Sequence, residues 1–131
     1  MFGDGKGYAV GSIEGRCGIK NYDLSKQDLG KADDFCFKCH REENKNAGRA
    51  EVYSVNGITF NTLYNTFATY GSEGAIIVWN KDTKSKYKSS KKFPASFTAA
   101  NFSEDGKLLA YAIGYDWGRG FEEQRNKQFP N

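Results

Sequence analysis

Two cysteines and a histidine stand close together in the stretch CFKCH, which runs from Cys36 to His40. Cys-x-x-Cys-His is the spacing at which a c-type haem is attached to a protein, with the histidine as an iron ligand. The same side chains could supply three of the four ligands of a structural zinc site. CFKCH therefore raises the alternative of a haem or metal protein that uses Cys36, Cys39 and His40.

The residues on either side of this stretch predict a β-strand, and a strand separates the two thiols. DDFCFKCHRE alternates with period two, so Cys36 and Cys39 are expected on opposite faces, whereas a haem requires both thiols at one porphyrin edge. The only methionine is Met1, so no internal methionine is available as a second axial ligand. We therefore expect a strand end at CFKCH, with no cofactor and no metal, and keep the haem or metal protein as an alternative.

The composition favours one antiparallel β domain. Of the 131 residues, 15% are aromatic, 15 are glycine and only 2 are proline, which is typical of sheets punctuated by turns. The formal net charge of +3 is too small to indicate a dedicated nucleic-acid binder. No apolar segment is long enough to span a membrane or resembles a signal peptide, so we expect reduced thiols in the cytosol or nucleus. No enzyme is expected, because His40 is the only histidine and GDGKG lacks the context of a phosphate-binding loop.

Short alternating runs separated by turn residues predict a series of strands with no long helix. The expected strands lie within residues 7–15, 16–24, 35–40, 55–61, 66–72, 75–80, 82–93, 96–103 and 108–117. REENKNAGRAE, residues 41–51, is predicted to be a charged loop without periodicity. The lysine-rich run 82–93 is expected to form an exposed edge strand, because lysine there deters pairing with another chain. A weak contact of this run with RNA phosphates is the alternative.

Two of these groups of strands resemble each other. TAANFSEDGKLLAYAIGYDW repeats the first two strands of ITFNTLYNTFATYGSEGAIIVWN, and SIEGRCGIKNYD resembles the last two strands of a preceding copy. Repetition of four-stranded units predicts an all-β fold of antiparallel propeller blades, about two to two and a half of them. The expected division is the end of one blade at residues 1–40, a full blade at 52–93 and the start of the next at 95–131.

Several motifs resemble one family of WD-repeat proteins. GSEG followed by IIVWN resembles the Gly-Ser-x-Asp-Gly…Trp-Asp signature of a WD repeat, and SIEGR, FKCHR, VNGITF, TFATYGSEG and YDWGRG occur in this order in that family. The family contains a messenger-RNA export factor that docks on nucleoporins and a mitotic-checkpoint protein that binds checkpoint kinases. The resemblance implies a seven-bladed ring of which this chain matches the C-terminal portion, so we expect a fragment.

The resemblance also implies a structural hydrogen-bond network of the His–Asp–Ser–Trp type. Its candidates are His40, Ser72 and Trp79, with Glu73 at the place where aspartate is usual. Glu73 reaches further than aspartate would, and Asn80 follows Trp79 where the signature has aspartate.

The partner-binding residues implied by the resemblance are mainly basic. In the family, the arginines of the matching SIEGR and FKCHR motifs lie on the propeller face and engage acidic residues of a partner peptide, which implies this role for Arg16 and Arg41. Lys38 lies close by in the sequence, and a planar guanidinium group binds carboxylates in bidentate fashion. The alternative is that both arginines pair with Glu14 or Glu42 on a solvated rim.

Trp117, just beyond a predicted strand, is expected to be either an exposed binding anchor or a lid over the blade. YDWGRG favours the export factor over its sister, because the checkpoint proteins tend to replace this tryptophan and basic residue with a more acidic stretch. The expected function is a non-enzymatic scaffold that binds an acidic nucleoporin segment in the export of poly(A) RNA, located in the nucleus, nuclear pore and cytoplasm. A spindle-checkpoint scaffold that binds checkpoint kinases is the alternative. Because an incomplete propeller exposes unpaired strand edges, self-association through these edges is also expected.

Overall fold

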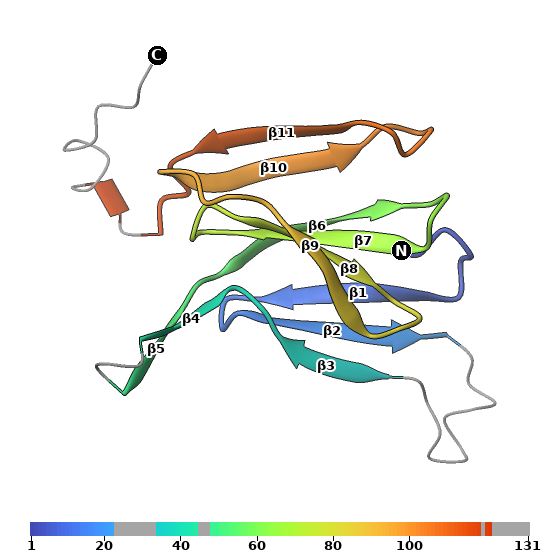
Figure 1. The fold of residues 1–131 in the computed structure, drawn as a ribbon, viewed down its shortest axis with the longest axis horizontal. Helices are drawn as coiled ribbons and strands as arrows, with labels where there is room; N and C mark the ends of the chain where they lie inside the picture. The colour runs from blue at the N-terminus through green and yellow to red at the C-terminus, as the bar shows by residue number, and fades with distance from the viewer. Residues whose placement is uncertain (23–33, 45–47, 119, 122–131) are drawn as a thin grey trace.

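The computed structural model describes residues 1–22, 34–44, 48–118 and 120–121. The elements within these residues are β-strands, apart from the two helical residues 120–121 (Figure 1). In chain order they are β1 (Gly7–Ser12), β2 (Arg16–Asn21), β3 (Phe35–Lys38), β4 (Arg41–Asn44), β5 (Arg49–Val52), β6 (Val55–Asn61), β7 (Thr66–Gly71), β8 (Ile76–Asn80), β9 (Ser85–Ser89), β10 (Ser96–Phe102) and β11 (Leu109–Gly114). Within the described residues no helix has the length and apolar character needed to cross a membrane.

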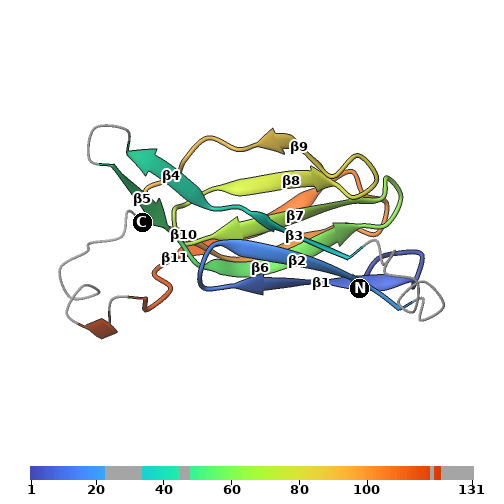
Figure 2. The same cartoon turned by 90° about the horizontal axis from the view of Figure 1, so that it is seen from below.

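The strands form four antiparallel sheets, which confirms the predicted all-β fold class. Their orders are β1-β2-β3, β4-β5, β6-β7-β8-β9 and β10-β11. In Figures 1 and 2 the four-stranded sheet lies between the sheet β1–β3 and the hairpin β10–β11, and β6 contacts both β1 and β10. Sheets stacked face to face in this way are the arrangement of successive propeller blades.

The core consists of two apolar layers, one on each face of the four-stranded sheet. The first layer packs Cys17, Ile19 and Phe67 against each other, and the second packs Ala68 and Phe97. Strand β7 supplies side chains to both layers because successive residues of a strand point to opposite faces. This explains why nearly all of β7 is buried, whereas a surface strand would alternate.

The described part of segment 41–51 is a hairpin, so the prediction of a charged loop is wrong there. Strand β4 pairs with β5, with Glu42 opposite Glu51. All of β5 is exposed, and no residue of β4 whose burial is described is buried. A hairpin of this kind shows no apolar alternation in its sequence. Its charges find partners outside the hairpin or beside it: Glu42 contacts Lys92, and Glu51 accepts a hydrogen bond from the Tyr53 hydroxyl at 2.6 Å.

The lysine-rich run forms an edge strand as predicted. Strand β9 is the last strand of its sheet and is exposed along its whole length. The predicted strand at 35–40 is shorter than expected, because β3 ends at Lys38 and His40 has a positive φ of 47°. The chain turns there and carries the His40 side chain inward.

The alternation of strand directions gathers several connections at one end of the stack. The turns that contain Gly15 and Gly74 lie there, as do the starts of β6 and β10 and the end of β11 (Figure 1, left). We call this end the Gly15–Gly74 end. The side chains discussed below come mostly from these connections.

Candidate functional site

A buried chain of hydrogen bonds links the connection after β3 to the four-stranded sheet. The side chains of His40 and Glu73 are 0% and 5% exposed, and His40 Nδ1 contacts Glu73 Oε1. His40 Nε2 lies 2.7 Å from Thr69 Oγ1, which also accepts a hydrogen bond from Trp79 Nε1 at 2.9 Å. The indole N–H of Trp79 can only donate and the ionised carboxylate of Glu73 can only accept, so these two groups form the donor end and the acceptor end of the chain. The ring nitrogens of His40, Thr69 Oγ1, Trp79 Nε1 and Glu73 Oε1 thus all have partners, whereas the buried Glu73 Oε2 has none in the described part of the chain.

Of the four residues expected in this network, the structure brings His40, Glu73 and Trp79 together, whereas Ser72 lies outside it. Thr69 provides the hydroxyl, because it lies on β7 two residues after Phe67, the register partner of Trp79. Ser72 lies beyond the end of β7 and contacts the Ser54 hydroxyl instead. In the sequence, Thr69 could have been identified as a member of the network because it carries the hydroxyl in the otherwise apolar run FATY, residues 67–70.

Gly71 gives Glu73 the space that its longer side chain needs. A Cβ atom at Gly71 would lie 2.5 Å from Glu73 Oε2 and 2.8 Å from His40 Nδ1. Both distances are far below van der Waals contact, so any side chain here would displace the pair. The replacement of the usual aspartate by Glu73 is therefore matched by a glycine at the end of β7.

Arg16 and Lys38 form an unneutralised pair of cations. They are direct register partners on β2 and β3, and both are exposed. Neither takes part in an ion pair or side-chain hydrogen bond within the described residues. Like charges directly opposite each other on a sheet repel, so an anion placed between them would be favoured.

Arg41 lies at the same end but its guanidinium group is already used. Its Nη2 donates to the backbone oxygen of Glu14 at 2.6 Å, which ties β4 to the turn between β1 and β2. In that turn Gly15 has a φ of 61°, and a Cβ there would lie 2.8 Å from Cys39 O. Arg41 therefore holds two closely packed connections together, through the backbone oxygen of Glu14 and not through the carboxylate pairing that was the alternative to partner binding.

Trp117 is exposed and is held on a structured segment after β11. Trp117 is 56% exposed, and its backbone φ is 62°. The centroid of its ring lies 5.8 Å from that of the Tyr115 ring. The preceding Asp116 accepts hydrogen bonds from Asn56 Nδ2 at 3.1 Å and from Gly118 N at 3.2 Å. These bonds fix the segment that presents the indole to solvent.

Asp116 is ionised at neutral pH. Burial raises the pKa of its carboxyl, but the hydrogen bonds that it accepts from Ser72, Asn56 and Gly118 outweigh burial and hold this pKa below its ordinary value. The Gly15–Gly74 end thus carries a negative charge on the segment after β11, next to Asn56 at the start of β6.

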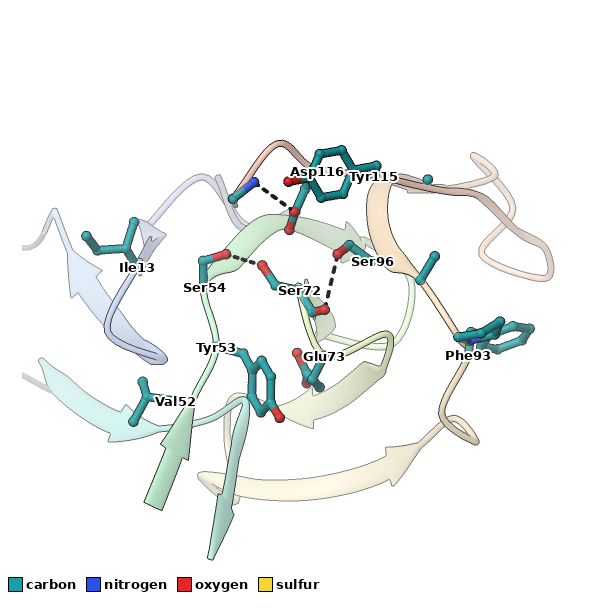
Figure 3. A pocket seen from close by; sticks show the side chains of 14 residues that line it. Ile13, Val52, Tyr53, Ser54, Ser72, Glu73, Phe93, Ser96, Tyr115 and Asp116 are labelled. Atoms are coloured by element: carbon teal, nitrogen blue, oxygen red, sulfur yellow. Dashed lines mark hydrogen bonds between the residues drawn. The ribbon is translucent and has the colours of Figure 1, made fainter. Parts of the chain in front are cut away.

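A cavity of about 520 Å³ opens at this end between the connections (Figure 3). Its walls come from the β1–β2 turn, the start of β6, the β7–β8 turn, the start of β10 and the segment after β11. The lining residues are Ile13, Val52, Tyr53, Ser54, Ser72, Glu73, Phe93, Pro94, Ala95, Ser96, Gly114, Tyr115, Asp116 and Gly118.

The cysteines of CFKCH lie on opposite faces, as predicted. Cys36 is exposed, whereas Cys39 and Cys17 are buried in the first apolar layer. Burial raises the pKa of both buried thiols to about 12, so they are neutral and unreactive at physiological pH. The described residues contain no group of three or more His, Cys, Asp or Glu side chains placed to hold a metal ion.

The stacked antiparallel sheets and the buried His–Glu–Thr–Trp chain define a WD-repeat β-propeller protein. No family model matches the chain. Among curated proteins, the poly(A)+ RNA export protein of Schizosaccharomyces pombe is 42% identical over 127 residues, which are 97% of this chain and 34% of that protein. The WD40 repeat protein poxJ of Penicillium oxalicum is 41% identical over 118 residues, 90% of this chain and 33% of that protein.

The mitotic checkpoint protein BUB3.1 of Arabidopsis thaliana is 41% identical over 121 residues, 92% of this chain and 34% of that protein. The chain thus belongs to the WD-repeat family that includes messenger-RNA export factors and mitotic checkpoint proteins. It spans about a third of the length of the curated relatives that it matches.

Proposed function

We propose that this chain acts in the nuclear export of poly(A) RNA, as part of a non-enzymatic WD-repeat scaffold whose Gly15–Gly74 end binds an acidic segment of a nucleoporin. The observation that carries the proposal is the 42% identity to a poly(A)+ RNA export protein along 97% of the chain. A protein with this role works in the nucleus, at the nuclear pore and in the cytoplasm.

The pair of Arg16 and Lys38 supplies the electrostatic part of the proposed contact. Both cations are exposed and lack a described partner, so they lose no existing ion pair when an acidic segment binds. Arg16 provides planar bidentate recognition of a carboxylate, and Lys38 adds a point charge beside it. Arg41 contributes by holding the β1–β2 turn that carries Arg16, and Trp117 offers an aromatic contact surface.

Capture of a synthetic nucleoporin segment by the full-length protein tests this proposal. Arg16→Glu is expected to weaken binding about 30-fold or more, because breaking a charge-paired contact at an interface costs about 2 kcal/mol or more. Lys107→Glu makes the same change in net charge in the exposed β10–β11 turn, at the other end of the sheets, and is expected to leave binding unchanged. Equal binding by the wild-type and Arg16→Glu proteins would remove Arg16 from the site.

The second candidate function is a spindle-checkpoint scaffold that binds checkpoint kinases. The 41% identity to a mitotic checkpoint protein favours it. The same capture experiment with a checkpoint-kinase segment separates the two functions, since the correct partner is the one that Arg16→Glu releases. The motif YDWGRG supports the export function, because checkpoint proteins of the family tend to have a more acidic stretch in its place.

We also propose that the described sheets are successive blades, with boundaries at 1–40, 52–93 and 95–131. Within the described residues β1 pairs only with β2, and β11 only with β10, so each has an unpaired edge. Self-association of the 131-residue chain through these edges is expected to shorten its elution time in gel filtration. Elution as a compact monomer would contradict it.

Two further proposals concern the lysines and the CFKCH stretch. A weak RNA contact through the exposed strand β9 predicts that Lys86→Glu with Lys88→Glu lowers binding of single-stranded RNA; unchanged binding would end that proposal. The haem or metal alternative predicts a haem absorbance band or bound metal in the purified protein.

A further inference from the structure

The cavity at the Gly15–Gly74 end differs in charge from the rest of the chain. The chain carries a formal net charge of +3, yet the fourteen lining residues include two carboxylates, Glu73 and Asp116, and no lysine or arginine. A volume of about 520 Å³ lies within the range of sites that take a ligand group. The cavity is therefore an acceptor-rich hollow in a basic surface.

The negative charge of this cavity is not neutralised within the described residues. Asp116 is hydrogen-bonded to Asn56 and Gly118, which are uncharged, and it has no ion-pair partner among the described side chains. Glu73 contacts His40 through Oε1, while its buried Oε2 has no hydrogen-bond partner in the described part of the chain. A part-buried carboxylate that is hydrogen-bonded but unpaired still attracts a cation, because its charge is only weakly screened.

The remaining walls suit an organic cation. Figure 3 shows the hydroxyl-bearing side chains of Ser54, Ser72 and Ser96 beside Asp116. Serine oxygens accept hydrogen bonds. The aromatic lining residues are Tyr53, Phe93 and Tyr115. Two of these rings already lie against cations of the chain itself, since Lys92 Nζ is 5.4 Å from the ring centroid of Tyr53 and Lys91 Nζ is 5.6 Å from that of Phe93.

The rim of the cavity is suited to a polypeptide rather than to a free ion. Ile13 is 82% exposed and Val52 is 42% exposed, and both line the cavity. Exposed apolar side chains at the mouth give a passing chain a surface to contact. Among the described residues, no three or more His, Cys, Asp or Glu side chains are placed to hold a metal ion at the cavity or elsewhere.

We propose that this cavity receives a basic side chain, an arginine or a lysine, of the polypeptide that docks at the Gly15–Gly74 end. This inference rests on the proposed function, because it assumes that a partner segment binds at this end. Recognition then has two signs: Arg16 and Lys38 take acidic residues of the segment, and the cavity takes a basic one. Such an arrangement fixes the direction in which the segment lies, because reversing it would place like charges together.

A probe pair that differs only in charge tests the cavity without any variant. N-acetyl-arginine methylamide and its citrulline analogue, which is a neutral near-isostere, are titrated into the isotopically labelled full-length protein. The arginine probe is expected to give saturable shifts of the Asn56 side-chain amide and the Gly118 backbone amide, with affinity at least ten-fold above that of citrulline. Absence of saturable shifts, or equal affinity for the two probes, would overturn the proposal, as would saturable shifts given by calcium chloride in place of the arginine probe.

Two variants separate this inference from the proposed function. Asp116→Asn keeps a side-chain oxygen to accept from Asn56 or Gly118 but removes the charge, and it is expected to reduce the affinity for the arginine probe to that for citrulline. Arg16→Glu is expected to leave binding of the arginine probe unchanged while it weakens capture of the acidic segment about 30-fold or more. If the wild-type protein does not discriminate between the two probes while Arg16→Glu still weakens segment capture, the cavity proposal alone fails. If the wild-type protein discriminates between the probes but Arg16→Glu captures the segment as well as wild type does, the proposed function alone fails.

Discussion

Glu73 stands in the wall of two cavities whose charges differ. The cavity of about 520 Å³ at the Gly15–Gly74 end has two carboxylates and no basic residue in its lining. The other, of about 460 Å³, lies between the β3–β4 connection and β9, and its cations outnumber its carboxylates: Lys38, Arg41, Lys86 and Lys92 against Glu42, Glu43 and Glu73. We call them the acidic cavity and the basic groove.

The difference between them shows how one fold presents both charge signs side by side. The lining of the acidic cavity comes mainly from turns and strand starts of three sheets, whereas the basic groove borrows the lysines of the edge strand β9 and of the segment after it. Lysines on an exposed edge strand deter pairing with another chain, and those of β9 also add positive charge to the groove beside it. The turn residues that line the acidic cavity are not on an edge strand and need no lysine for this purpose.

The largest expected effect comes from Gly74, whose turn places Glu73 between the two cavities. Gly74 has a φ of 79°, and a Cβ there would lie 2.3 Å from Phe93 O, a backbone atom. Gly74→Ala is therefore expected to lower the free energy of unfolding by about 3 kcal/mol, through strain and displacement of backbone. Urea denaturation measures this loss.

Gly5→Ala is the matched control for the Gly74 variant. Gly5 also has a positive φ, of 67°, but nothing lies within 4 Å of its added Cβ. Its expected cost is about 1 kcal/mol, from the backbone conformation alone. Equal losses in the two variants would show that the close approach at Gly74 is unimportant.

The next effect comes from the hydrogen-bonded chain that holds Glu73 in the wall common to both cavities. Thr69→Val keeps the shape of the side chain but leaves His40 Nε2 and Trp79 Nε1 without their partner. The free energy of unfolding is expected to fall by about 2 kcal/mol, since two buried polar atoms lose a hydrogen bond. Thr62→Val, at an exposed position in the β6–β7 turn, is expected to stay within about 0.5 kcal/mol of wild type.

Arg41 and Arg16 should separate stability from binding. Arg41→Ala removes a donor to Glu14 O and is expected to cost about 1 kcal/mol of stability, while Arg16→Ala, with no described partner to lose, is expected to cost almost none. In capture of the acidic segment the order reverses, and Arg16→Ala has the larger effect. If Arg16→Ala proved the more destabilising variant, Arg16 would have a structural contact that the described residues do not contain.

The smallest effect is a change in the acid side of the stability profile. Because the pKa of Asp116 in the folded chain is below its ordinary value of 3.8, its ionised form stabilises the fold above about pH 4, and this contribution is lost as the pH falls through the folded pKa. Asp116→Asn is expected to make the free energy of unfolding fall less steeply between about pH 4 and pH 2. A slope identical to that of wild type would indicate that Asp116 is unperturbed by the acidic cavity.

Much of the fold follows from local patterns in the chain. Apolar alternation and turn residues predict the strands β1–β3 and β6–β11 near their observed bounds, and the lysines of β9 predict an edge. The same patterns fail for β4 and β5, because none of their residues whose burial is described is buried, which leaves no alternation to detect. For the site, the order of the family motifs pointed to Arg16, Lys38 and Trp117, which are exposed at the same end of the stack or on the segment beside it.

Other features depend on residues that meet only after the sheets have packed. Thr69 joins His40 and Trp79 because β7 lies between β6 and β8 with Trp79 in register with Phe67, a relation that no short window of residues contains. Arg41 has a hydrogen-bond partner because the β1–β2 turn brings the backbone oxygen of Glu14 close to its guanidinium group. Arg16 has no such partner among the described residues. The period of the strands, the turns and the net charge are set by neighbouring residues along the chain. Which hydroxyl is buried, which cation is free and where the carboxylates gather are set by long-range packing, because hydrogen bonds and charges act between atoms close in space whatever their separation along the chain.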